Sequence, residues 1–441
     1  MNREENVLGN DFSTGGLLVF ALPTMVMMVF LGLYTMVDTV FVSRFVSTDA
    51  LGAINIVTPV INLVVGLGTM LAAGGNAIIS RTMGEGDCGR ARESFTMLVF
   101  CGGAAGTVLA ALGFVMTDEI LEVLGAGGGL FEYAKEYLRI LLVFFPAYML
   151  QTMFANLFVT AGHPGLGSFL FVGSGILNLV LDYVFIVVLD MGIQGAALGT
   201  GFGYLMPTAA GLWFFGTQRR ETLHFCRISW DIRVLAESCA NGSSEMVSQL
   251  AMAVTCFLFN RNMMRLAGED GVAAITIINY SQFLLNTLFM GFSMGVAPVL
   301  GYHFGRGDGE RLKRILRSCL KVILWTCAGV FLTAYFGGGR VVNLFAREGG
   351  RVYVLAAEGF RLFSVSFLFC GVNIFASSMF TALSNGKVSA FLSFLRTFAF
   401  LTVGIIALPR LWGIRGIWLA VPLAEGAAFL VSVRFLKKEI V

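Results

Sequence analysis

The chain repeats itself, because a shift of 221 positions aligns its first half with its second half without a gap. The shift pairs identical residues along the whole length: Asp49 with Asp270, Gly74 with Gly295, Asp87 with Asp308 and Leu198 with Leu419. A fold made of two equivalent halves has a natural cavity where the halves meet. A polar residue that occurs in one half only is therefore a candidate for function rather than for architecture.

The composition is that of a membrane protein. Hydrophobic residues make up 57% of the chain and charged residues only 13%, and the mean hydropathy of +0.81 is too high for a soluble domain of this length. Apolar segments of the roughly 20 residues needed to span a bilayer occur at 15–43, 51–80, 94–116, 137–160, 166–189, 194–217, 232–260, 272–303, 315–337, 354–383, 388–408 and 412–436. These segments predict an all-α integral membrane protein with twelve transmembrane helices.

The repeat also predicts the topology. Each half supplies six helices, an even number, so the two six-helix lobes run in the same direction and are related by a pseudo-twofold axis along the membrane normal. We expect an N-terminal lobe over 1–217, a cytoplasmic linker over 218–231 and a C-terminal lobe over 232–441. More of the 30 Lys and Arg residues fall on the side of the termini, which predicts that both termini are cytoplasmic.

Several classes of function find no support in the sequence. The 8 cysteines form no CxxC pair and no external cluster, which argues against a disulfide framework or a metal cluster. The 3 histidines lie far apart, so no catalytic constellation is visible and an enzyme is not expected. The net charge of +3 follows from the cytoplasmic basic residues and gives no support for nucleic-acid binding. We expect no cofactor, and the sequence leaves the oligomeric state open, with a monomer allowed.

Ionisable residues inside the predicted spans are candidate functional residues, because each costs at least about 2.5–3.5 kcal/mol at the centre of a membrane helix. Four such residues stand out: Asp38 on helix 1, Asp182 on helix 5, Glu245 on helix 7 and Arg396 on helix 11. The shift pairs none of them with a similar residue in the other half: their counterparts are Phe259, Val403, Thr24 and Gly175. Each therefore needs a partner, a cavity or a function.

A set of oxygen-bearing residues is confined to the first half. Asn178 and Asp182 are four residues apart on helix 5 and so share one helix face. Asp38 and Thr200 complete the set. Carboxylate, amide and hydroxyl oxygens suit a hard cation such as Na+, whereas two carboxylates in one poorly solvated pocket repel each other and so favour binding of a proton. Hydrogen bonding to neighbouring helices is the alternative for Asn178 or Asp182 alone.

The second half offers candidates for substrate binding. Glu245 and Arg396 fit either a structural salt bridge across the C-terminal lobe or a substrate site in which Glu245 anchors a cationic compound.

Soft and aromatic side chains on helices 1 and 4, in the first half, suit a cleft that tolerates varied ligands, although packing against the core or lipid explains each of them alone. They are Tyr34, Met36, Met153 and Phe154.

Several segments resemble the multidrug and toxic compound extrusion (MATE) family. They are Met36-Val-Asp-Thr-Val-Phe-Val-Ser-Arg-Phe, Gly84-Glu-Gly-Asp with its echo Gly305-Arg-Gly-Asp, and Gly192-Ile-Gln-Gly-Ala-Ala, while Gly242-Ser-Ser-Glu is similar to the MepA-type bacterial branch. The resemblance implies a two-lobed antiporter that exchanges Na+ or H+ for bulky, often cationic, organic compounds. It also implies that Asp38, Asn178, Asp182 and Thr200 hold the coupling ion, with Asn156 on helix 4 linked to them.

The sequence therefore predicts a multidrug efflux antiporter in the bacterial cytoplasmic membrane, with small organic substrates and lipid as its partners. A lipid-linked glycan flippase of the same superfamily is the alternative. It would need a cationic groove for pyrophosphate, and Arg396 is the only basic residue well inside a predicted span. A channel is a third interpretation, which uphill transport would exclude.

Overall fold

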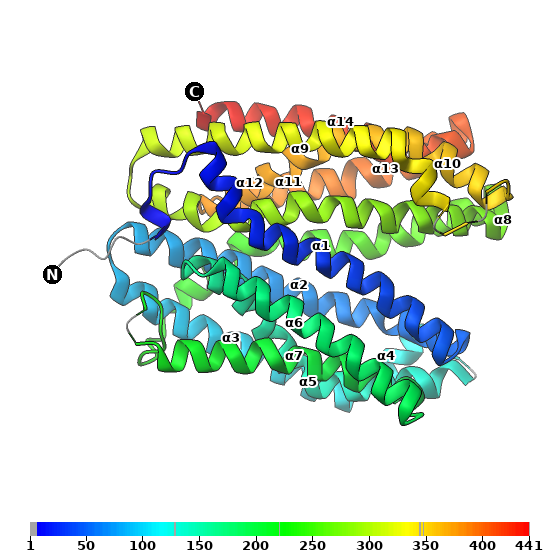
Figure 1. Cartoon of the computed structure of the whole chain (residues 1–441), viewed down its shortest axis with the longest axis horizontal. Coiled ribbons are helices and arrows are strands. Elements are labelled where there is room, and N and C mark those ends of the chain that lie inside the picture. The colour runs from blue at the N-terminus through cyan, green and yellow to red at the C-terminus, as the bar shows by residue number, and fades with distance from the viewer. Residues whose placement is uncertain (1–6, 128, 220, 344, 347, 441) are drawn as a thin grey trace. The chain divides into compact units, whose positions relative to one another are not determined.

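The computed structural model describes residues 7–127, 129–219, 221–343, 345–346 and 348–440, apart from the side chains of residues 39–40, 43–44, 48–49, 51 and 440. Every regular element in this part of the chain is a helix (Figure 1). The first repeat contains η1 (Val7–Gly9), α1 (Thr14–Phe45), α2 (Thr48–Gly84), α3 (Cys88–Val115), α4 (Thr117–Val123), α5 (Gly129–Thr160), α6 (Pro164–Asp182), the π-helical η2 (Tyr183–Val188) and α7 (Gly192–Thr217).

The second repeat begins with the long helix α8. It contains α8 (Ile232–Gly305), α9 (Gly309–Asn343), α10 (Arg351–Phe363), the 3-10 turn η3 (Ser364–Ser366), α11 (Phe367–Ala382), α12 (Gly386–Phe394), the π-helical η4 (Leu395–Phe400), α13 (Leu401–Trp412) and α14 (Ile414–Ile440). Among the described residues, 10 helices are long and apolar enough to cross a membrane. Because α8 holds two of the predicted spans and α7 supplies one more, the predicted twelve membrane helices are confirmed.

The connection between the predicted spans 232–260 and 272–303, both within α8, is shorter than the sequence predicts. The apolar segments end at residue 260 and resume at 272, yet α8 stays helical through this stretch except at Gly268. Gly268 has a φ of 67° and a ψ of −152°, a conformation open to glycine because it lacks a Cβ. One residue is therefore enough to separate the two helices, and no longer loop is needed.

Packing divides the chain into two compact units that do not follow the order of the repeats. Unit 1 comprises Met1–Asn10 and Phe30–Gly242, and unit 2 comprises Asp11–Val29 and Ser243–Val441. The first half of α1 therefore packs with the second repeat, and the first turns of α8 pack with the first repeat. The lobe boundaries expected at residues 217 and 232 describe the sequence repeat and stay predictions.

In unit 1, the first turns of α8 approach α2 very closely. A Cβ on Gly74 would overlap the carbonyl oxygen of Ser238, and a Cβ on Gly242 would overlap the carbonyl oxygen of Met70. Small residues allow membrane helices to approach in this way, and the contact is held by dispersion because lipid supplies no hydrophobic driving force between helices. The two glycines therefore fix the start of α8 to unit 1.

In unit 2, the first half of α1 packs on the last part of α8 through the equivalent positions. Thr24 Oγ1 donates a hydrogen bond to the carbonyl oxygen of Gly291 at 2.9 Å. A Cβ on Gly295, the counterpart of Gly74, would lie 2.9 Å from the Cα of Ala21. The two repeats thus share one type of helix contact, and each makes it with the opening helix of the other repeat.

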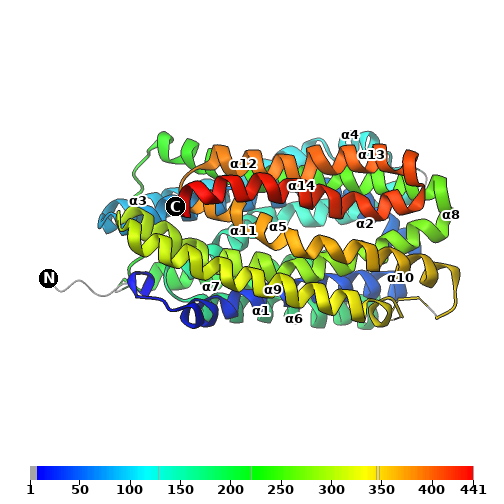
Figure 2. The same cartoon turned by 90° about the horizontal axis from the view of Figure 1, so that it is seen from above.

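Each unit has a central helix. In unit 1, α5 contacts α2, α3, α6 and α7, and α6 lies beside α7 (Figure 1). The segment 218–231 also packs on this unit, where Arg92 Nε donates to the carbonyl oxygen of Thr222 at 2.8 Å. In unit 2, α14 contacts α10, α11, α12 and α13 (Figure 2). These contacts place α6 and α7, which carry Asn178, Asp182 and Thr200, in unit 1. They place η4, which carries Arg396, and α14 in unit 2.

Replacing Gly74 with alanine should lower the free energy of unfolding by about 1–3 kcal/mol, the usual cost of an extra methyl group in a packed interface. The control is Gly329→Ala on α9, where an added Cβ has no neighbour within 4 Å and alanine favours the helix. Thermal unfolding of both purified variants in detergent measures the difference. Equal midpoints for the two variants would contradict the close approach of α8 to α2.

Candidate functional site

The four predicted ion-site residues all lie in unit 1. Asp38 is on the second half of α1, where it is half-buried. Asn178 and Asp182 are in the last turns of α6, with exposed fractions of 2% and 0%, and Thr200 on α7 is 8% exposed. Three different helices therefore bring oxygen-bearing side chains into the interior of one unit, as the sequence predicts for such a set.

The two carboxyl groups interact directly. Asp38 and Asp182 lie within hydrogen-bonding reach of each other, yet neither carboxylate oxygen of Asp182 has a hydrogen-bond donor among the described residues. Ionised carboxylates only accept hydrogen bonds, so this contact is attractive only when the two groups share a proton or a cation. No described residue supplies a hydrogen-bond donor to Asp182, so the pair fits a proton or cation from outside.

Asn178 adds to this requirement. Neither its amide nitrogen nor its amide oxygen has a hydrogen-bond partner in the described part of the chain, whereas Ser174, one turn earlier, donates to the carbonyl oxygen of Gly203 at 2.6 Å. A buried polar group without a partner costs about 1–3 kcal/mol. The unsatisfied atoms of Asn178 and Asp182 thus fit a bound ion, proton or water better than a purely structural role.

Glycines on α7 make room for these side chains. A Cβ on Gly199 would overlap Oδ1 of Asp182, and a Cβ on Gly203 would lie 3.3 Å from the Cβ of Asn178. A Cβ on Gly195, four residues before Gly199, would lie 3.0 Å from the Cβ of Phe185. The spacing of four keeps the three glycines on one face of α7, so the backbone of α7 forms one wall of the site.

Tyrosines surround the acidic pair, and the sequence reasoning missed three of the four. Tyr34 and Tyr137 lie close enough to both Asp38 and Asp182 for electrostatic interaction. The rings of Tyr148 and Tyr204 are 4.6 Å apart. The test applied to the acids would have found these tyrosines, because the 221-residue shift pairs none of them with another tyrosine: the counterparts are Thr255, Glu358, Phe369 and Glu425.

The helix changes its geometry at the site. Directly after Asp182, the segment Tyr183–Val188 forms a π-helix. Short π-helical segments are rare and occur often at functional sites. In unit 2 a π-helix over Leu395–Phe400 contains Arg396. Asp182 thus directly precedes one π-helix and Arg396 lies within the other. The hydrophobic pattern of the sequence does not reveal either π-helix.

Arg396 is neutralised within unit 2. Its Nε donates to Oε1 of Glu425 at 2.8 Å, and the other carboxylate oxygen of Glu425 accepts a hydrogen bond from Nδ2 of Asn373 at 2.7 Å. The ion pair considered between Arg396 and Glu245 is therefore not formed, because Glu425 takes that place. Glu425 lies inside the predicted span 412–436 and meets the criterion that identified the other four ionisable residues, which makes it an omission of the sequence analysis.

The remaining candidate residues are Met153, Phe154, Met36 and Asn156. Met153 and Phe154 on α5 are almost fully buried, and the ring of Phe154 stacks on Phe215 at 5.7 Å. Met36 is half-buried on α1. Asn156 donates to the carbonyl oxygen of Thr152 in its own helix at 3.3 Å. A role for these residues in a substrate cleft or in the ion site stays a prediction.

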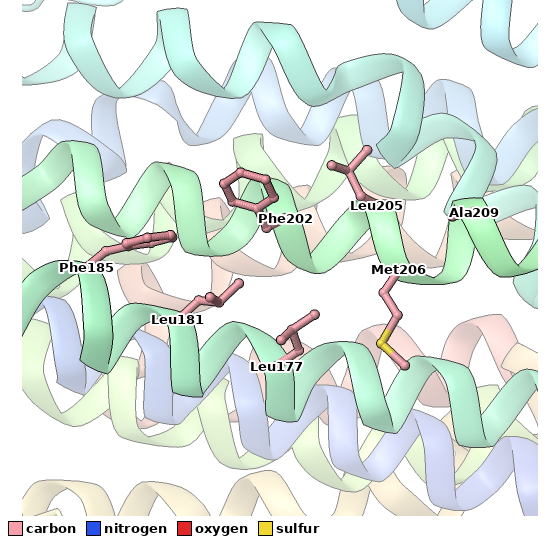
Figure 3. A pocket seen from close by; sticks show the side chains of 7 residues that line it. All are labelled: Leu177, Leu181, Phe185, Phe202, Leu205, Met206 and Ala209. Atoms are coloured by element: carbon pink, nitrogen blue, oxygen red, sulfur yellow. The ribbon is translucent and has the colours of Figure 1, made fainter.

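A pocket of about 410 Å³ lies between α7 and the segment formed by α6 and η2 (Figure 3). Its lining is apolar and consists of Leu177, Leu181, Phe185, Phe202, Leu205, Met206 and Ala209. Apolar side chains offer no ligands to a cation, so this pocket is not the ion site. In the described part of the chain no group of three His, Cys, Asp or Glu residues could hold a metal ion, so a cation here depends on the mixed oxygen set.

Gly199→Ala should lower the free energy of unfolding by about 1–3 kcal/mol, because the new methyl group would collide with Asp182. In an Asp182→Ala background the same change should cost almost nothing, since the overlapping oxygen is gone, and a double-mutant cycle isolates this coupling. Gly216→Ala on the same helix is the control, with its nearest neighbour 4.0 Å away. An equal cost of Gly199→Ala in both backgrounds, measured by thermal unfolding, would contradict the contact.

Arg396→Met should lower the free energy of unfolding by about 3–5 kcal/mol, because Glu425 would remain buried and charged without its partner. Adding Glu425→Gln removes that charge and should restore most of the loss. Thermal unfolding of the single and double variants measures the recovery. If the double variant is no more stable than the single one, the ion pair does not have the role described.

Comparison with known proteins identifies the family of the chain. A sequence model of the MatE family matches the chain twice, over residues 23–184 and 246–406. The multidrug export protein MepA of Staphylococcus saprophyticus is 21% identical over 426 residues, which cover 95% of this chain and 92% of the relative. MepA of Staphylococcus aureus is 23% identical over 428 residues, covering 94% of this chain and 91% of the relative.

Solved structures share the fold. A multidrug resistance MATE family transporter of the MOP superfamily, in an outward-facing conformation, matches 100% of this chain and 98% of its own with a TM-score of 0.92 and 21% identity. A MOP superfamily transporter from Pyrococcus furiosus matches with the same coverage, a TM-score of 0.91 and 21% identity. The two matches of the family model fall in the two repeats and together span most of the sequence. The chain therefore belongs to the multidrug and toxic compound extrusion (MatE) family, on its MepA-type branch.

Proposed function

We propose that this protein is a multidrug efflux antiporter of the bacterial cytoplasmic membrane, which exchanges Na+ or H+ for bulky cationic organic compounds by alternating access. One observation carries the proposal: Asp182 is fully buried beside Asp38, and no described residue donates a hydrogen bond to either of its carboxylate oxygens. The MepA relatives are multidrug export proteins, which supports the substrate class. The excess of basic residues on the side of the termini supports cytoplasmic termini.

The proposed coupling follows from the charge of the acidic pair. With an ion or proton bound, Asp38 and Asp182 can lie together beside Asn178 and Thr200, whose oxygens complete the ligand set. Without it, two buried negative charges repel each other and draw in water, which favours a different packing of α1 against α6. The bound ion thus stabilises one arrangement of unit 1 over the other.

Exchange requires that the ion and the organic compound oppose each other. If ion binding weakens the affinity for the compound by some factor, the compound weakens the affinity for the ion by the same factor. Unit 1 has two arrangements that differ in their affinity for the ion. If the organic compound binds better to the ion-free arrangement, the ion and the compound weaken each other's binding. The mechanism needs no cofactor and no covalent step.

The flippase alternative loses its main support in unit 2. A groove for pyrophosphate needs an excess of positive charge, but the guanidinium of Arg396 forms an ion pair with Glu425 at 2.8 Å. The acidic pair in unit 1 would repel a phosphate group as well. The charge distribution therefore favours export of cations over movement of an anionic lipid.

Asp38→Asn and Asp182→Asn should each reduce ion-driven efflux at least tenfold, because an amide cannot carry the charge that the coupling ion neutralises. Uptake of a fluorescent cationic dye from the medium into everted membrane vesicles measures export, driven separately by a Na+ gradient and by a pH gradient. The gradient that drives efflux in the unmodified protein identifies the coupling ion.

The control for both variants is Asp190→Asn, the same chemical change at an exposed position whose positive φ of 52° suits asparagine. This variant should retain full efflux. Undiminished ion-driven efflux in both Asp38→Asn and Asp182→Asn, with normal amounts of protein in the membrane, would overturn the proposed coupling site.

A further inference from the structure

One face of α9 is exposed and faces away from unit 2. The helix contacts α10, α11 and α14, and buried residues such as Ile315, Cys319 and Ile323 lie on the packed side. The opposite face carries Trp325, which is 79% exposed, and Phe336, which is 78% exposed. Lipid tails are as apolar as these side chains, so in a membrane protein this face of α9 lies against lipid.

Three cationic residues continue the same face toward the start of α9. Arg314, Arg317 and Lys321 are all exposed. Steps of three and four residues join them to one another and to Trp325, which places them on one side of a helix. Arg314 and Lys321 are about 10 Å apart along the helix axis. The lipid-facing surface of α9 therefore changes from apolar to cationic within a short distance.

The depth of these residues matches the surface of the membrane. Arg317 and Lys321 lie in the first two turns of the predicted span 315–337, at the edge of the hydrocarbon. Helical side chains tilt toward the N-terminus of their helix, and long Lys and Arg side chains reach back from such positions to the headgroups. Trp325, one turn further, is of a type enriched at the interface. The three charges thus meet lipid at the level of its phosphates.

The acids nearby do not balance these charges. Arg311 meets Asp11 at 3.5 Å and Asp308 at 3.7 Å, whereas Arg314 reaches Asp11 only at 4.0 Å and its side chain is 68% exposed. An exposed ion pair of this kind contributes little. The segment 306–321 carries 6 basic and 2 acidic residues, so the exposed face keeps an excess of positive charge.

The first repeat has no such surface. The 221-residue shift pairs the three cations with an acid, a hydroxyl and an aromatic residue: Glu93, Thr96 and Phe100. Basic residues that only set the orientation of a membrane protein need to lie on the correct side, not on one helix face. Their shared lipid-facing position and their restriction to one repeat favour recognition of a ligand.

We propose that Arg314, Arg317 and Lys321 form a binding site for the phosphate of an anionic phospholipid headgroup, with the acyl chains lying along Trp325 and Phe336. Guanidinium groups bind phosphate oxygens in pairs, and clusters of basic residues beside a membrane helix attract anionic lipids. A zwitterionic lipid carries its own cation and so gains less from this surface. The site goes beyond the exchange reaction and does not depend on which ion is coupled.

The test uses the tryptophan on the proposed site. Purified protein is placed in phosphatidylcholine vesicles that contain either brominated phosphatidylglycerol, which is anionic, or brominated phosphatidylcholine. Bromine quenches tryptophan fluorescence on contact, and subtracting the signal of Trp325→Phe isolates the quenching at Trp325. At low salt the anionic lipid should quench Trp325 at least about threefold more effectively than the neutral lipid, and high salt should reduce this preference by screening.

Charge removal should abolish the preference. The combined variant Arg314→Gln, Arg317→Gln and Lys321→Gln should be quenched equally by both lipids. The combined variant Arg314→Lys, Arg317→Lys and Lys321→Arg, which keeps the charges, should retain most of the preference.

The matched control removes the same number of exposed charges from the segment before α8 and from its first turn, and should keep the preference. It combines Arg219→Gln, Arg227→Gln and Arg233→Gln. Equal quenching of the unmodified protein by the two lipids, or a preference that survives loss of the three α9 charges, would overturn the proposal. A preference lost in inorganic phosphate but not in NaCl of the same ionic strength would assign the cations to free phosphate and would also overturn it.

Discussion

Gly199 lets the backbone of α7 lie directly against the carboxylate of Asp182. Any larger side chain at this position would displace the carboxylate or separate the two helices, and water would then reach Asp182. The close contact keeps Asp182 at 0% exposure and leaves its charge without solvent or donors. A requirement for an external ion or proton thus arises from the packing of a residue that has no side chain.

The two units solve the same electrostatic problem in different ways. In unit 1, Asp38 and Asp182 lie together with no basic residue paired to them in the described part of the chain, so the neutralising charge has to arrive from outside. In unit 2, Arg396 supplies a permanent positive charge and Glu425 accepts it at 2.8 Å. Unit 1 thus carries two neighbouring acids where unit 2 carries a fixed ion pair, and this difference is what the proposed ion coupling in unit 1 rests on.

The periodic hydrophobicity and the repeat predicted the helices well, because membrane spans depend on length and apolar composition rather than on distant contacts. Asp182, a residue of the proposed ion site, stood out for a similar reason, because an acid inside an apolar span is conspicuous. Glu425 met that criterion and was overlooked, whereas the ion pair that it forms with Arg396 could not be predicted. The two residues lie on consecutive predicted spans, 29 positions apart, but only packing decides which acid Arg396 meets.

The sequence by itself determined the number of membrane helices, the doubling of the fold and the residues that carry charge into the membrane, because each of these follows from local composition or from the register of the repeat. Only the tertiary structure decided that the first half of α1 packs with the second repeat, that tyrosines gather around the acidic pair and that Arg396 pairs with Glu425. These outcomes depend on which helix surfaces fit together at close range, and glycine positions such as Gly74 and Gly199 have this effect only where a particular neighbour approaches them.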